Sequence, residues 1–296
     1  MLPIIDTHQH MWDRNIFNLT WIEGAGSLNA DFLMSDYLEA SREINVVKTI
    51  YMEVDVDPQQ QRKEAEYVSA LSQSPDNPMA AAVVSGRPGA EDFAAYARVL
   101  AADPSIKGIR QVLHTPATPP GTCLEKAYIE GVRLLGELGL SFDICIRPGE
   151  LGDAVQLVDQ CPDTRFILDH CGNADPLVVS GAKESEPDDP YEHGRQQWLR
   201  DMAELGKREN AVCKVSGIVA RVPAEWSARD LAPTVDHCLD SFGPDRVVFG
   251  GDWPVCTLGA PLHDWATALR EIIADRSAAE QLKLLHDNAA RLYGLD

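Results

Sequence analysis

Basic residues are scarce in this sequence. Its 296 residues include 26 Lys and Arg against 46 Asp and Glu, which gives a formal net charge of −20. A chain with this charge repels polyanions, and no basic patch is set apart from the acidic residues. We therefore expect neither nucleic acid nor an anionic membrane among its partners.

Paired cysteines and long apolar runs are also missing. The seven cysteines are odd in number and none belongs to a Cys-x-x-Cys pair, which predicts free thiols in a reducing compartment. No N-terminal basic and apolar segment looks like a secretion signal, and no apolar run approaches the roughly 20 residues that cross a bilayer. These absences predict a cytoplasmic protein without a membrane segment.

The sequence does contain a repeated unit, in which a short β-branched, apolar run is followed by a polar loop and then by a helical pattern. The runs that we predict as strands are 4–12, 46–54, 80–84, 106–114, 140–146, 165–170, 212–215 and 246–249. The clearest helical patterns between them are 57–72, 89–102, 124–138 and 149–160.

This alternation predicts the fold class. Strands alternating with helices over 1–296, with 45% hydrophobic residues and no linker, indicate a single α/β domain folded as a (β/α)₈ TIM barrel. A doubly wound open sheet is the alternative, weakened because no Gly-x-Gly-x-x-Gly turn follows the first strand. The acidic segment 180–191 has no periodicity and is predicted as an insertion in the loop after the sixth strand.

The first predicted strand carries two histidines that are two residues apart. The period of two in a strand places Asp6, His8 and His10 on one face. Two imidazoles on one strand can bind a divalent metal or a substrate carbonyl, and the charge that completes such a site must come from elsewhere in the chain. A pair of surface histidines is the alternative.

Polar side chains also lie where the later strands end. These residues are Arg110, His114, Arg147, His170, Lys214, Ser216 and Asp252. Because a (β/α)₈ barrel builds its active site at the C-terminal ends of its strands, we predict that they converge there. Taken singly, Arg147 could instead pair with a carboxylate, Lys214 could reach solvent from a strand end, and His114 could be a loop histidine.

The strand period also predicts which side chains point into the barrel. It places Arg110 and His114 on one face with Val112, and Arg147 on a face with Asp143 and Cys145. The same period places Asp252 on a face with Val248 and Gly250.

Four motifs, in register from residue 4 to the C-terminus, carry a resemblance to a known family. They are Asp6-Thr7-His8-Gln9-His10-Met11-Trp12, Lys107-Gly108-Ile109-Arg110-Gln111, Asp169-His170-Cys171-Gly172 and Gly251-Asp252-Trp253-Pro254. The sequence resembles the amidohydrolase superfamily, in the branch that holds sugar-lactone and dicarboxylate-lactone hydrolases. The resemblance implies a TIM barrel that hydrolyses a cyclic ester or related bond at His8, His10, His170 and Asp252.

The resemblance also implies a metal site, with one departure. Amidohydrolases with two metals use a bridging lysine at the end of strand four, whereas Lys107 lies toward the other end of that strand. We therefore expect one divalent ion, zinc, bound by His8, His10, His170 and Asp252, a ligand set that leaves a position for water. A metal-free site is the alternative, because members of this branch are divided between one metal and none.

The predicted roles follow from this ligand set. Asp252 is the predicted general base for the attacking water, with His170 as the second catalytic residue, and Arg110 is predicted to stabilise the oxyanion. The residues predicted to bind the substrate are Arg110, His114, Arg147, Glu53, Lys214 and Trp253. For Glu53 the alternative is an ion pair with Arg110.

The predicted activity is the opening of a small polar lactone, with a sugar-acid lactone favoured over a dicarboxylate lactone. Decarboxylation of an aromatic acid is the second enzymatic alternative, and a barrel-shaped binding protein without turnover is the alternative from another class. The expected partner is thus a small-molecule substrate, chosen by the loops 11–32, 115–126 and 173–193. The sequence does not indicate an oligomeric state.

Overall fold

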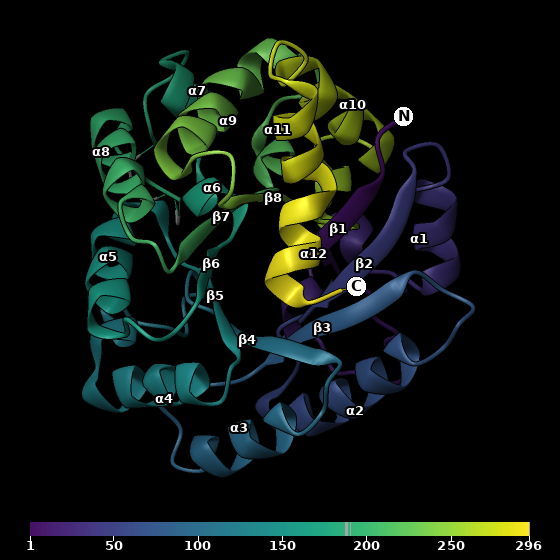
Figure 1. Cartoon of the computed structure of the whole chain (residues 1–296), viewed down its shortest axis with the longest axis vertical. Coiled ribbons are helices and arrows are strands. Elements are labelled where there is room, and N and C mark those ends of the chain that lie inside the picture. Colours follow the sequence, from purple (N-terminus) through teal and green to yellow (C-terminus); the bar gives the residue numbers. More distant parts are fainter. Residues whose placement is uncertain (187–188, 190, 296) are drawn as a thin grey trace.

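Eight short parallel strands form the centre of the molecule and follow one another in chain order (Figure 1). The computed structural model describes residues 1–186, 189 and 191–295. The strands are β1 (Ile4–Gln9), β2 (Val46–Met52), β3 (Met79–Ser85), β4 (Ile106–Val112), β5 (Ser141–Cys145), β6 (Phe166–Leu168), β7 (Ala211–Val215) and β8 (Val247–Phe249). The predicted (β/α)₈ barrel is confirmed, and the C-terminal ends of all eight strands meet at one end of it.

The barrel closes between β1 and the segment that follows β8. The Thr7 hydroxyl donates to the Phe249 carbonyl at 2.7 Å, and the Asp252 N–H donates to the His8 carbonyl at 2.8 Å. The His10 N–H then donates to the Trp253 carbonyl, also at 2.8 Å. The two segments that carry the predicted metal ligands are therefore joined directly through their backbones.

Helices surround the barrel, and the last of them covers one end (Figure 1). They are α1 (Met34–Ala40), α2 (Gln61–Ser72), α3 (Phe93–Ala101), α4 (Lys126–Glu137), α5 (Leu151–Gln160), α6 (His170–Asn173), α7 (Pro176–Ser180), α8 (Arg195–Gly206), α9 (Ala228–Phe242), α10 (Leu262–Ile272), α11 (Ala278–Leu282) and α12 (Asn288–Tyr293). Ala289 and Tyr293 of α12 form one apolar cluster with Ile5, Ile50 and Val248, which belong to β1, β2 and β8. The opposite end of the barrel, where the strands finish, is therefore the end at which a functional site can form.

The four predicted helices correspond to α2, α3, α4 and α5, each beginning two to four residues later than expected. The segment predicted as an insertion lies between α7 and α8, and its residues 187, 188 and 190 fall outside the described residues. No helix in the described part of the chain combines the length and the apolar character needed to cross a membrane.

Strand β6 ends two residues earlier than predicted, and β8 ends at Phe249, as predicted, without extending to Asp252. His170 and Asp252, which were expected to continue these strands, both have a φ of 55°. This left-handed conformation is uncommon for a residue with a side chain and interrupts an extended strand. The two predicted site residues therefore lie on turns just beyond the strands, and not within them.

Strand β1 departs from the predicted alternation of side chains. Its pairing with β2 shifts register between Asp6 and Gln9, so the two-residue period is interrupted there. Asp6 faces outward and accepts a 2.7 Å hydrogen bond from the Tyr37 hydroxyl of α1. The prediction that Asp6 shares a face with His8 and His10 is therefore wrong.

Gly131 of α4 tests how closely the helices pack around the barrel. A Cβ added there would lie 2.2 Å from the Pro88 carbonyl oxygen. We expect Gly131→Ala to lower the free energy of unfolding by about 1–3 kcal/mol, because the backbone must move to admit the methyl group. Urea unfolding measures this change.

Gly152→Ala, near the start of α5, is the matched control, because a Cβ there meets nothing within 4 Å. Alanine should leave stability unchanged or raise it by up to about 1 kcal/mol through its better helix propensity. Equal stability of the two variants would contradict the packing argument.

Candidate active site

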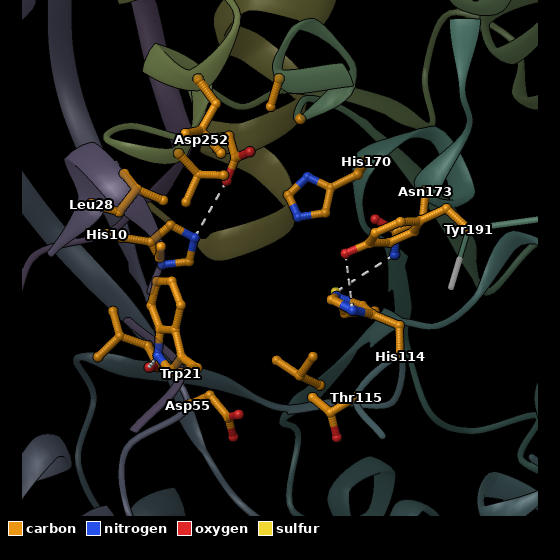
Figure 2. A pocket seen from close by; sticks show the side chains of 18 of the residues that line it. His10, Trp21, Leu28, Asp55, His114, Thr115, His170, Asn173, Tyr191 and Asp252 are labelled. Atoms are coloured by element: carbon orange, nitrogen blue, oxygen red, sulfur yellow. Dashed lines mark hydrogen bonds and ion pairs between the residues drawn. The ribbon is translucent and has the colours of Figure 1, made fainter. Parts of the chain in front are cut away.

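A cavity of about 410 Å³ opens at the C-terminal ends of the strands (Figure 2). Its volume falls in the range of about 300–1,000 Å³ that is typical of small-molecule sites. His10, Arg110, His170 and Asp252 all line it, and they come from four different strands or strand ends. The structure thus brings these predicted site residues together at the expected end of the barrel.

His8, His10 and Asp252 form the centre of the site. The Nε2 atoms of the two histidines are 3.1 Å apart, and an Asp252 carboxylate oxygen lies 3.5 Å from the first and 3.3 Å from the second. The Nδ1 atom of His10 lies 3.0 Å from the Met52 carbonyl oxygen, to which it must donate. The lone pair of His10 Nε2 therefore points toward His8 and Asp252.

This arrangement fits a divalent cation. His8 Nδ1 lies 3.5 Å from the Asp169 carboxylate, and burial lowers the His8 pKa well below its ordinary value, so the ring is neutral. A proton on Nδ1 leaves the Nε2 lone pair of His8 directed at that of His10, and two lone pairs 3.1 Å apart repel unless a cation lies between them. Two imidazole nitrogens and one carboxylate are ligands that suit zinc.

His170, the fourth predicted ligand, stands slightly apart from this trio. Its ligand atoms group with His8 and Asp169, and its ring centroid lies 4.5 Å from that of His8. The Ser216 hydroxyl is 3.0 Å from Nδ1 of His170, and burial lowers the pKa of this histidine. His170 is a neutral imidazole on the cavity wall (Figure 2).

The backbone around His170 is unusual. His170, Cys171, Gly172 and Asn173 all have positive φ, between 53° and 67°. The Trp198 indole donates to the Cys171 carbonyl at 3.0 Å, and the Asn173 amide donates to the Ile146 carbonyl at 2.8 Å. Contacts with the surrounding helices and strands thus hold a turn that local preferences disfavour.

Asp169 is the functional residue that the sequence reasoning missed. Its buried carboxylate lies 2.8 Å from Lys214 Nζ, 3.1 Å from an Arg110 nitrogen and 3.5 Å from His8 Nδ1. Burial alone would raise the pKa of Asp169, but Lys214, His8 and Arg110 outweigh that effect and hold it well below the ordinary value. The signal for Asp169 in the sequence is its place in the motif Asp169-His170-Cys171-Gly172, one residue before His170.

Glu53 takes the role that was considered as its alternative. Its Oε1 accepts a 2.7 Å hydrogen bond from Arg110 Nε, and a second Arg110 nitrogen donates to the Glu53 carbonyl at 2.8 Å. Its side chain is 1% exposed. Glu53 therefore positions Arg110 and does not itself reach the cavity.

Three further predicted substrate-binding residues also lie outside the cavity lining. Arg147 donates to the Thr115 and Thr118 carbonyls at 2.6 and 2.8 Å and pairs with the Glu150 carboxylate at 3.1 Å. Lys214 has no exposed side-chain surface and pairs with Asp143 and Asp169 inside the barrel. Arg147 and Lys214 therefore contact other parts of the protein, and their positions do not support the predicted contacts with the substrate.

Trp253 is buried as well, and it packs edge-on against Phe32 and Tyr37. Its ring supports the loop after β1 and the helix α1. The prediction that Trp253 contacts the substrate is therefore not supported by its position.

In a polar corner of the cavity, the sequence reasoning predicted His114 but missed Tyr191 and Arg221. His114, which was predicted, lies 3.2 Å from the Tyr191 hydroxyl (Figure 2). Arg221 lies 3.4 Å above the Tyr191 ring and donates to the Asn173 side-chain carbonyl at 3.0 Å. Burial lowers the pKa of His114 to about 3, so it is neutral here. No period in the loops that carry Tyr191 and Arg221 marks them in the sequence.

Comparisons with known proteins agree over the whole chain. A family model described as amidohydrolase matches residues 5–295. An L-fucono-1,5-lactonase from Burkholderia multivorans is 29% identical over 304 residues, which cover 98% of this chain and 96% of that protein.

Solved structures show the same similarity. An amidohydrolase from Burkholderia multivorans, crystallised with bound Zn, is 25% identical and has a TM-score of 0.83 over 99% of this chain and 100% of that one. A probable 2-pyrone-4,6-dicarboxylic acid hydrolase from Acinetobacter baumannii is 17% identical over 99% of this chain and 100% of that one, and its TM-score of 0.72 shows a shared fold.

Lys214 provides a test of the buried network. Lys214→Met removes the cation between Asp143 and Asp169 and leaves two carboxylates facing each other in the barrel. We expect the free energy of unfolding to fall by about 3–5 kcal/mol, as when one partner of a buried ion pair is removed. Thermal and urea unfolding measure the loss.

Lys207→Met is the control, since this lysine pairs with Glu204 at the C-terminal end of α8, where both side chains are exposed to solvent. Its stability should stay close to that of the wild type. A Lys214→Met protein as stable as the Lys207→Met protein would show that the buried network is not needed for folding.

Proposed function

The chain belongs to the amidohydrolase family, and from this premise we propose that it hydrolyses a small lactone of a sugar acid. The observation that carries this proposal is the grouping of His8, His10 and Asp252, of which His10 and Asp252 line the cavity. The similarity to an L-fucono-1,5-lactonase over nearly the whole chain supports a sugar lactone as the substrate class.

Asp252 is the residue best placed to act as the general base. Its carboxylate lies at the cavity wall, and its backbone N–H is held by the His8 carbonyl at 2.8 Å. A water molecule beside this carboxylate can lose its proton to Asp252 while it attacks the lactone carbonyl. The protonated Asp252 can then return the proton to the ring oxygen as the carbon–oxygen bond breaks.

The metal is proposed to be one divalent ion, zinc, held by His8, His10 and Asp252 with His170 adjacent. Such an ion polarises a carbonyl group and lowers the pKa of bound water. The bound Zn in the Burkholderia multivorans amidohydrolase supports this choice. Asp169 orients the His8 ring from the opposite side, as the outer partners of metal-binding histidines commonly do.

Arg110 contributes a fixed positive charge at the cavity wall. Glu53 and Asp169 hold its guanidinium on two sides, and one of its nitrogens lies 3.4 Å from His8 Nε2. Its orientation is therefore set before any substrate binds, which is the condition for stabilising the oxyanion that forms during attack.

A dicarboxylate lactone is the second candidate substrate, and Arg221 is the observation that favours it. Arg221 lines the cavity, and no carboxylate among the described residues pairs with it. A partly buried guanidinium of this kind suits the carboxylate of a ligand. The first candidate is preferred because Asp55 brings a carboxylate to the same cavity, which would repel a doubly charged substrate.

Removing the base tests the proposed reaction. Asp252→Asn should fold normally and lose roughly 10²–10⁴-fold in kcat, because amide nitrogen and oxygen cannot take the proton from water. The assay compares wild type and variant on sugar lactones, on carboxylated pyrones and lactones, and on aromatic acids.

Turnover by wild type of carboxylated lactones alone, abolished by Arg221→Met, would favour the second candidate. Release of carbon dioxide from an aromatic acid without any lactone turnover would favour decarboxylation. Full activity in Asp252→Asn would reject the assigned base.

Measuring the metal content of the wild type and of two histidine variants tests the proposed cofactor. Elemental analysis of protein purified without chelator should find about one zinc per chain, since the site offers one set of ligands. His10→Ala should lose the zinc, whereas His237→Ala, which changes a histidine of the outer helix α9, should retain it. Retention of zinc in His10→Ala would show that the ion is held elsewhere.

A further inference from the structure

Asp55 brings a second carboxylate to the cavity, opposite the catalytic residues. It follows β2 and lines the cavity together with its neighbour Val54, and Figure 2 shows it beside Trp21. Its side chain keeps 31% of its surface exposed, in contrast to the fully buried acids inside the barrel. Nothing in the proposed mechanism uses this carboxylate.

The backbone holds Asp55 in an uncommon conformation. Its φ is 49°, in the left-handed region, and its N–H donates to the Glu53 carboxylate at 2.6 Å. Glu53 is itself fixed by Arg110, so the turn is tied to the catalytic network. A non-glycine residue kept in this region by its surroundings is frequently found at a functional site.

The charge of Asp55 is only partly balanced. Arg87 is its ionic partner among the described residues, at 3.5 Å, and Arg87 is also 31% exposed. Burial, together with the neighbouring Glu53, raises the pKa of Asp55 to about 6, against the opposing effects of Arg87 and Arg110. A carboxylate in this state has unused acceptor capacity that faces the cavity.

Trp21 provides an apolar surface next to this carboxylate. Its indole N–H donates to the Val54 carbonyl at 2.7 Å, which fixes the ring. Figure 2 shows the ring lying between His10 and Asp55 along one side of the cavity. An aromatic surface beside a carboxylate suits a molecule that has C–H groups on one face and hydroxyl groups at its edge.

We propose that Asp55 is a specificity-determining residue that selects polyhydroxylated, uncharged lactones by accepting hydrogen bonds from their hydroxyl groups. This inference rests on the proposed function and extends it by naming the side chain that recognises the hydroxyl groups of the substrate. Asp55 acts in binding, and the proton transfers remain with Asp252. Its negative charge also disfavours substrates that carry a carboxylate at this side of the cavity.

The experiment compares two lactones of the same ring size, glucono-δ-lactone and δ-valerolactone, which differ in their hydroxyl groups. Wild type should prefer the hydroxylated lactone. Asp55→Asn should raise KM for glucono-δ-lactone by roughly 10-fold with little change in kcat, because an amide is the weaker acceptor. KM for δ-valerolactone should stay the same.

Matched variants separate this role from a structural one. Asp55→Glu keeps the carboxylate and should recover part of the preference, while Glu66→Gln, an equal change of charge on the outer surface of α2, should leave both lactones unaffected. For wild type, KM for glucono-δ-lactone should rise as the pH falls below about 6, where Asp55 becomes protonated, and this rise should be absent from Asp55→Asn.

The outcomes also separate this inference from the proposed function. A wild-type enzyme that opens neither lactone nor any other sugar lactone would overturn the proposed function. A wild-type enzyme that opens glucono-δ-lactone, with an Asp55→Asn variant that keeps the same KM and the same pH profile, would overturn the role of Asp55 alone.

Discussion

The pairing of Asp169 with Lys214 and Arg110 is the interaction on which the rest of the site depends. A carboxylate buried without partners would cost several kcal/mol, so both cations must remain inside the barrel for Asp169 to stay ionised. Lys214 Nζ lies 2.8 Å from Asp169, and the nearest Arg110 nitrogen lies 3.1 Å away. This network fixes the orientation of the His8 ring. The Nε2 edge of the ring faces His10 and Asp252 because Asp169 lies beside Nδ1 on the other edge.

The same backbone hydrogen bonds that close the barrel also bring the site residues together. The backbone bonds that join β1 to the segment after β8 connect the carriers of His8, His10 and Asp252. Gly250 is required at this junction, because a Cβ there would lie 2.7 Å from the Cβ of His8. Side chains placed on rigid, mutually bonded segments keep their geometry better than side chains on loops, which is what proton transfer and metal binding demand.

The residues with left-handed backbone conformation at the site are closely packed against neighbouring segments. Gly217 has a φ of 70°, and a Cβ there would lie 2.3 Å from Nδ1 of His170, so a larger residue would displace that ring. The left-handed turns at Asp55, His170 and Asp252 all aim side chains into the cavity from strand ends. Each turn costs of order 1 kcal/mol, which the surrounding hydrogen bonds offset.

The sequence by itself determined the barrel and the identity of the central residues. Alternating strand and helix patterns predicted the fold, and strand ends marked His8, His10, Arg110, His170 and Asp252. Only the tertiary structure decided which polar residues face the cavity and which are buried. A local period describes the direction of a side chain within one strand, but the register shift between Asp6 and Gln9 interrupts that period and separates Asp6 from His8 and His10. The partners of Lys214, Glu53 and Asp169 come from other strands, so pairing across the barrel, which no local pattern encodes, fixed their roles.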